Sequence, residues 1–254
     1  MRVRWVWAFL DLPDHGFEEA VQFWRAVTRT SVSPWRGDQD QFATLLPEQG
    51  DAWVKVQRVG GVGGVHVDLD VDVPLAEARD LAVSMGAKVL DEVLDGDGAL
   101  EVVVCRSPGG FVFCLTSWAP AETTSGQMRV GQPSLVDQVF LDIPSDRYAV
   151  EVEFWSGLTG WAVQDVDSPE FERLACPREL PVRFLLQRLE EPSGPVRGHV
   201  DLACADVRAE CDRHRALGAQ EVGPGDGWVV MRDPNGHEYC CTGRDPLTGG
   251  AAAD

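Results

Sequence analysis

Two short segments of the sequence place a histidine and a carboxylate two residues apart. His66 and Asp68 form one pair, and His199 and Asp201 form the other. In an extended strand, residues two apart point to the same face, so each histidine shares a face with its aspartate. A carboxylate beside an imidazole fixes its charge and tautomer and can make it a base near neutral pH. Two readings follow: paired acid/base groups in a site, or pairs that only satisfy buried polar groups at a seam in the fold.

The two segments belong to an internal repeat that covers most of the chain. Residues 64–69 match 197–202, and the flanking segments match in the same order, from the Phe-Leu-Asp runs at 9–11 and 140–142 to the Cys-containing ends at 113–116 and 239–242. A segment rich in small and polar residues separates the copies. The sequence therefore predicts two domains, residues 1–118 and 134–243, with a linker at 119–133 and a flexible tail at 244–254.

Each copy is itself doubled, because strand and helix periodicities alternate twice within it. In the first copy we expect helices at 16–29 and 74–85, and in the second at 147–158 and 206–217, the rest being short strands. Each half then has the order βαβββ. The predicted fold class is α+β, with four βαβββ modules in two tandem domains.

Composition narrows the class of partner and the cellular location. The 254 residues carry a formal net charge of −19, which repels nucleic acid and anionic membrane surfaces. Seven cysteines, an odd number without a CxxC pair, indicate reduced thiols in a cytoplasmic protein. No apolar run approaches the length of a membrane span, so we expect neither membrane nor nucleic-acid partners, and a monomer or homodimer.

The order of motifs resembles one superfamily. Phe154-Trp155, the His199-Val200-Asp201-Leu202 run and the Asp233-Pro234-Asn235-Gly236 turn before the last strand resemble the vicinal oxygen chelate superfamily, which includes glyoxalase I, bleomycin-resistance proteins and extradiol dioxygenases. The similarity is closer to its glyoxalase-like domain branch. It implies that each domain is a cupped mixed sheet with helices on the outer face and a cavity inside the cup. The first copy has Ser107-Pro108-Gly109-Gly110 in place of the Asp-Pro turn, which makes it the better candidate for a purely structural partner.

The resemblance also implies where a metal would bind. Metal-using members take His or Gln, Glu, His and Glu from the first, fourth, fifth and eighth strands of a domain. These positions fall on Trp7, Gln57, His66 and Cys114 in the first copy and on Gln138, Gln187, His199 and Cys240 in the second. Neither set keeps the acidic oxygen ligands that a hard divalent ion needs, so we expect no metal and no other cofactor. A Cys/His zinc site in the second copy is the alternative, and buried structural cysteines are the other.

The remaining candidates describe a pocket rather than a metal centre. Trp7 and Trp53 are candidate walls, Asp11 and Asp142 share the face of the first strands, and Gln57 and Gln187 lie on hairpin strands. Aromatic walls with nearby carboxylates suit an aromatic or cationic organic ligand. We therefore expect a small-molecule binding protein of the glyoxalase or bleomycin-resistance type. The alternative is a lyase, isomerase or dioxygenase-like enzyme in which His66, Asp68, His199 and Asp201 are catalytic. The other histidines, His15, His214 and His237, are expected at the surface.

Overall fold

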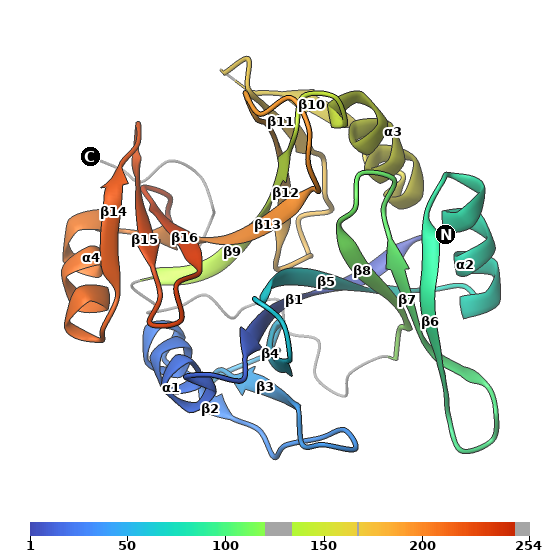
Figure 1. Ribbon diagram of the computed structural model, residues 1–254, viewed down its shortest axis with the longest axis horizontal. Coiled ribbons are helices and arrows are strands. Elements are labelled where there is room, and N and C mark those ends of the chain that lie inside the picture. Colours follow the sequence, from blue (N-terminus) through green and yellow to red (C-terminus); the bar gives the residue numbers. More distant parts are fainter. Residues whose placement is uncertain (120–133, 167, 247–254) are drawn as a thin grey trace. The chain divides into compact units, whose positions relative to one another are not determined.

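A computed structural model describes residues 1–119, 134–166 and 168–246. Most of the predicted linker and the tail beyond residue 246 lie outside these described residues. The described chain confirms the predicted fold class: it contains two eight-stranded mixed sheets and four helices, arranged as four βαβββ modules (Figure 1).

The first sheet follows the first copy of the repeat. Its strand order is β2-β3-β4-β1-β5-β8-β7-β6. The elements of this copy are β1 (Val3–Pro13), α1 (Phe17–Thr28), β2 (Ser31–Val32), β3 (Phe42–Leu46), β4 (Val54–Val59), β5 (Gly64–Val71), α2 (Leu75–Ser84), β6 (Lys88–Leu94), β7 (Leu100–Arg106) and β8 (Val112–Ser117).

The second sheet repeats the arrangement with the order β10-β11-β12-β9-β13-β16-β15-β14. Its elements are β9 (Ser134–Ile143), α3 (Tyr148–Thr159), β10 (Val163–Asp165), β11 (Phe171–Leu174), β12 (Arg183–Arg188), β13 (Arg197–Cys204), α4 (Val207–Ala216), β14 (Gln220–Pro224), β15 (Trp228–Arg232) and β16 (Glu238–Thr242). No helix among the described residues is long and apolar enough to cross a membrane.

Strand alternation decides which side chains reach the core. On β5, Val67 and Leu69 are fully buried and lie opposite Phe113 and Leu115 of β8 in a parallel pairing. Helix α2 covers strands β6 to β8 on one side of the sheet. His66 and its neighbour two residues on must point to the other face, since side chains alternate along a strand.

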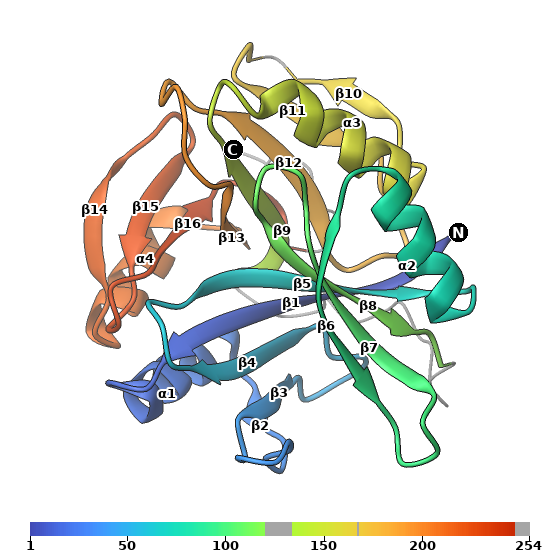
Figure 2. The same cartoon turned by 45° about the vertical axis from the view of Figure 1, so that its right-hand side comes forward.

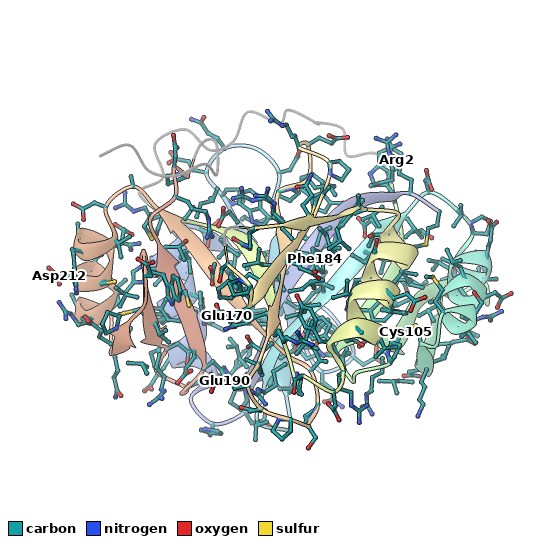
Figure 3. The ribbon with its side chains drawn as sticks, turned by 90° about the horizontal axis from the view of Figure 1, so that it is seen from above. Arg2, Cys105, Glu170, Phe184, Glu190 and Asp212 are labelled. Atoms are coloured by element: carbon teal, nitrogen blue, oxygen red, sulfur yellow. The ribbon has the colours of Figure 1, made fainter. Side chains whose placement is uncertain are left out.

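The first helix of each copy carries a tryptophan that anchors it to the core. Trp24 on α1 and Trp155 on α3 are 2% and 0% exposed, as helical periodicity predicted. Phe184 of β12 is packed against Trp155, with ring centroids 5.7 Å apart, and lies in the interior in Figure 3. Asp212, by contrast, lies on the outward side of α4 in the same view.

Packing divides the described chain into two compact units. The first contains residues 1–8, 66–119 and 139–198, and the second contains residues 9–65, 134–138 and 199–246. Each unit therefore combines one module from each copy of the repeat. In the second unit α4 packs on β14, β15 and β16, which lie side by side (Figure 2).

Candidate functional site

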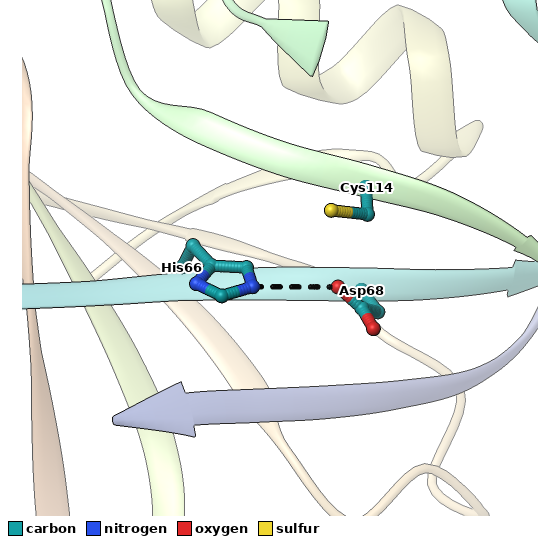
Figure 4. Close-up of side chains that lie close together, drawn as sticks. All are labelled: His66, Asp68 and Cys114. Atoms are coloured by element: carbon teal, nitrogen blue, oxygen red, sulfur yellow. Dashed lines mark ion pairs between the residues drawn. The ribbon is translucent and has the colours of Figure 1, made fainter. Parts of the chain in front are cut away.

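In the first unit, adjacent parallel strands bring His66, Asp68 and Cys114 together. Asp68 on β5 is in register with Cys114 on β8, and His66 precedes Asp68 on the same face (Figure 4). The His66 Nε2 and Asp68 Oδ1 atoms are 3.6 Å apart, and the ligand atoms of all three residues lie within 4.8 Å of one another. All three side chains are buried. Burial raises the pKa of the Cys114 thiol to about 11, although its hydrogen bond with His66 opposes that rise.

Trp7 lies against the same strand. Its indole Nε1–H donates to Asp70 Oδ2 at 3.1 Å, and the Thr116 hydroxyl donates to Asp70 Oδ1 at 2.6 Å. Asp70 follows Asp68 by two residues, so strand alternation puts it on the face that carries the histidine. The predicted aromatic wall is therefore fixed in orientation by a carboxylate that the sequence did not single out.

The second unit contains the equivalent group, His199, Asp201 and Cys240. Asp201 on β13 is in register with Cys240 on β16. His199 Nε2 lies 3.5 Å from Asp201 Oδ1 and 3.9 Å from the Cys240 sulfur. Asp201 is 1% exposed, and within the described residues its Oδ1 accepts no hydrogen bond. Burial raises the pKa of Asp201 to about 6, against the opposing electrostatic effect of the neighbouring His199 and Arg244 side chains.

Arg244 joins this second cluster to a further buried carboxylate. Its Nη2–H donates to Asp137 Oδ1 at 2.7 Å and its Nε–H donates to Asp137 Oδ2 at 3.3 Å. Its Nη1 lies 3.5 Å from Asp201 Oδ2. Asp137 and Arg244 were both missed from the sequence. The available signal was an arginine two residues after the last strand, at the first residue of what was predicted to be the tail.

Other predicted residues are placed as follows. Trp53 is 7% exposed, and its indole N–H donates to the Val136 carbonyl at 2.8 Å, which ties β9 to the segment preceding β4. Gln138 is buried on β9, directly after Asp137. Gln57 faces Phe42 across β3 and β4, and Gln187 faces Phe171 across β11 and β12.

The structure thus joins only some of the predicted site residues. Trp53, Gln57 and Asp11 belong to the second unit, whereas His66 belongs to the first. In the same way, Asp142 and Gln187 belong to the first unit and His199 to the second. Asp11 and Asp142 are half-buried at equivalent positions of β1 and β9. The two clusters therefore comprise the His, Asp and Cys residues, with Trp7 and Gln138 on neighbouring strand positions.

One histidine was misjudged from the sequence. His214 was expected on an exposed helix face, but it is 0% exposed. Its Nδ1 lies 3.0 Å from the Tyr239 hydroxyl and 3.5 Å from the Cys241 sulfur, and its Nε2 lies 3.6 Å from Glu210. Burial lowers the pKa of His214, although Glu210 opposes the shift. The polar face of α4 is buried because it packs against α1, where the Phe23 and His214 rings are 6.3 Å apart.

Comparison with known families now identifies the fold. The family model described as "Glyoxalase-like domain" matches residues 7–116 and 138–242. The chain belongs to the glyoxalase-like domain family. This match confirms the resemblance noted in the sequence, and it covers both copies. No curated protein matches the chain.

Solved structures share the fold at low identity. A 4-hydroxymandelate synthase mutant from Streptomyces coelicolor is 14% identical with a TM-score of 0.62, covering 100% of this chain and 95% of that one. A Mn(II)-bound glyoxalase from Novosphingobium aromaticivorans is 18% identical with a TM-score of 0.62, covering 99% and 85%. An extradiol ring-cleaving dioxygenase from B. fuscum is 17% identical with a TM-score of 0.63, covering 96% and 72%. These similarities establish the vicinal oxygen chelate fold of this glyoxalase-like protein.

The donor set of the second cluster does not fit the metal that the fold family implies. Mn²⁺ prefers oxygen ligands, whereas the cluster offers one imidazole, one thiol and one carboxylate. That carboxylate, Asp201, already lies beside the guanidinium of Arg244. The first cluster offers the same three donor types. Three donors of mixed N, O and S type match borderline ions such as Zn²⁺ better than Mn²⁺.

Proposed function

We propose that this glyoxalase-like protein binds a small organic molecule at its two His-Asp-Cys clusters without the divalent metal used by other members of the fold. The observation that carries the proposal is the same arrangement in both copies, buried throughout in the first and with only His199 half-buried in the second. In each, a histidine and an aspartate stand 3.6 or 3.5 Å apart beside a cysteine, on the sheet face that the helix does not cover. Buried polar groups that converge in this way orient ligands in mostly apolar sites.

The surroundings favour an aromatic or cationic ligand. Trp7 is held by Asp70 close to the first cluster, and aromatic rings attract flat or positively charged molecules. Among the structures with this fold, one is a homoprotocatechuate 2,3-dioxygenase variant in complex with HPCA, so the fold is able to bind a small organic molecule.

A second candidate function is acid/base catalysis by the same pairs. In both pairs a carboxylate oxygen lies close to an imidazole nitrogen, at 3.6 Å between Asp68 and His66 and at 3.5 Å between Asp201 and His199. Such an imidazole can take a proton from a bound substrate, and the carboxylate stabilises the imidazolium that forms. The fold supports several chemistries, so it does not choose among lyase, isomerase and dioxygenase-like reactions.

Binding is tested by calorimetric titration with a panel of phenols, catechols and aromatic amines. We expect saturable binding by the wild type, with H66A and H199A each weakening it at least tenfold, which corresponds to ~1.4 kcal/mol. The matched control is H15A, since His15 is exposed before α1. Absence of heat across the whole panel, or equal losses in H15A and the cluster variants, contradicts the proposal.

Catalysis is tested on any compound that binds, by following its conversion with and without the H66A/H199A double variant. Turnover that disappears in the double variant while binding persists assigns the enzyme function. Turnover that survives in the double variant rejects the acid/base role. Binding without turnover by the wild type supports the binding protein.

A further inference from the structure

Two buried carboxylates, Asp201 of the second cluster and Asp137 outside it, need a positive partner. Asp137 is 0% exposed and Asp201 is 1% exposed. Two anionic groups held near one another in a buried site repel, and a cation must offset their charge or one must take up a proton.

Here the cation is part of the chain. Arg244 makes a two-pronged contact with Asp137, at 2.7 Å and 3.3 Å, and its remaining Nη1 lies 3.5 Å from Asp201. A guanidinium suits this place because its planar N–H groups reach two carboxylates at once and it stays protonated. The arginine side chain is only 19% exposed, so the surrounding protein holds it in position.

We propose that Arg244 is the resident cation of the second cluster and that it keeps divalent metal out of this site. The guanidinium supplies the positive charge that a metal ion would otherwise bring to Asp137 and Asp201. The inference concerns cation binding and holds whether or not a small organic ligand binds, so it goes beyond the proposed function.

The pairing of Arg244 with Asp137 has no counterpart at the equivalent positions of the first copy. With the offsets of the repeat, Arg244 corresponds to Trp118 and Asp137 corresponds to Val6. Both the arginine and its principal carboxylate are thus absent from these positions in the first copy, where the Arg4 guanidinium instead lies 4.4 Å from the Trp118 ring centre. The pair therefore exists or is missing as a unit, as expected for two charges that neutralise each other.

Removal of the arginine should leave a donor set that suits a borderline metal ion. Asp201 would provide a carboxylate, His199 an imidazole nitrogen and Cys240 a sulfur, and these ligand atoms lie within 4.8 Å of one another. Three such protein donors, with water in the fourth position, are a set that Zn²⁺ and Co²⁺ take in proteins. Replacing Arg244 by the uncharged, similarly long methionine should therefore convert a closed site into a metal site.

The experiment titrates Co²⁺ into H66A, which disables the first cluster, and into H66A/R244M. Calorimetry measures affinity, and a sulfur-to-cobalt charge-transfer band in the near ultraviolet reports coordination by Cys240. We expect H66A/R244M to bind Co²⁺ at least a hundredfold more tightly than H66A, and the band to vanish when C240S is added. The matched control is R208M, because Arg208 is an exposed arginine on α4 that pairs with Glu221. Equal affinity of H66A and H66A/R244M, or a gain of the same size from R208M, overturns the proposal.

Loss of Arg244 also leaves two buried negative charges, so the variant needs a folding control. Thermal unfolding with and without Co²⁺ provides it, together with H66A/R244M/D137N, which removes one of the two charges. If H66A/R244M folds only when Co²⁺ is present, the metal has replaced the arginine, which supports the proposal. If Co²⁺ does not restore folding and the D137N version, once folded, binds Co²⁺ no better than H66A, the proposal is rejected.

Discussion

In both copies, the turn before the last strand contacts a buried carboxylate that also accepts the indole N–H of a helix tryptophan. The carboxylate comes from a different element in each copy. In the second unit the carboxylate is Asp233, from the turn itself. Its Oδ1 accepts hydrogen bonds from the backbone N–H groups of Asn235 and His237, both at 2.9 Å. Its Oδ2 accepts the indole N–H of Trp24, from helix α1, at 3.0 Å.

In the first unit, the equivalent turn position is Ser107, which has no carboxylate. The carboxylate comes instead from helix α3: Glu151 accepts the backbone N–H of Gly109 with one oxygen and the indole N–H of Trp155, at 2.8 Å, with the other. The Ser107 hydroxyl accepts the Phe111 N–H at 3.0 Å. Glu151 and Ser107 together therefore accept the backbone and indole N–H groups in the first unit, as Asp233 alone does in the second.

The comparison changes the interpretation of the first copy. Its Ser-Pro-Gly-Gly turn resembled a degraded motif and made this copy the better candidate for a purely structural partner. The turn is nevertheless held by a carboxylate and a tryptophan, as in the second copy. Motif loss at this turn is therefore no reason to rank the first His-Asp-Cys cluster below the second.

The largest expected effect comes from removing the helix carboxylate. E151A leaves two buried donors, the Gly109 N–H and the Trp155 indole, without an acceptor. Each unsatisfied donor costs about 2 kcal/mol, so we expect a loss of about 4 kcal/mol in the free energy of unfolding. Chemical denaturation measures it, and E153A on the exposed side of the same helix is the control. A loss below ~1 kcal/mol would contradict the equivalence of Glu151 and Asp233.

Helices α2 and α4 occupy equivalent places in the two copies, but only α4 buries ionisable side chains. This difference predicts that the stability of the protein depends on pH in the acid range. Glu210 and His214 on α4 stand where α2 has Ala78 and Ala82. Burial alone would raise the pKa of Glu210, but hydrogen bonds with His214, Arg213 and Ser134 outweigh it and lower the pKa to about 2. A carboxyl with a lowered pKa stabilises the fold above its unfolded value near 4.5, and this contribution disappears as the pH falls toward 2.

We therefore expect the stability difference between wild type and E210Q to shrink between pH 5 and pH 2. The pKa difference corresponds to about 3 kcal/mol at most. Denaturation curves at several pH values measure the difference, and A78Q, at the matched position of α2, is the control for placing an amide in a buried helix face. A wild type minus E210Q difference that stays constant down to pH 2 would show that Glu210 is not held ionised by its neighbours.

The sequence predicted the repeat, the four modules and the buried tryptophans because these depend on local periodicity and on order along the chain. It also identified His66, Asp68 and Cys114, since strand alternation and register follow from the motif positions. It missed Glu151, Arg244 and the burial of His214. These residues meet partners from the other copy or from the far end of their own domain, and each compact unit mixes modules from both copies. No local pattern records which distant donor a helix carboxylate will meet.

The smallest expected effect concerns the ends of the first helix in each copy. Arg29 caps the C-terminus of α1 with φ 52° and ψ 46°, and the equivalent Gly160 caps α3 with φ 71° and ψ 13°. The left-handed conformation costs a residue with a Cβ about 1 kcal/mol more than glycine. We expect R29G to stabilise the protein by ~0.5 kcal/mol, because greater freedom of the unfolded chain offsets part of the gain. G160A should destabilise it by about 1 kcal/mol through backbone strain alone, since a Cβ at Gly160 would meet no atom within 4 Å.

Thermal unfolding of the two single variants and the double variant measures both changes. The effects should add, because the two caps belong to different compact units. A destabilising R29G would instead show that the Arg29 side chain makes a contribution larger than the strain of its backbone.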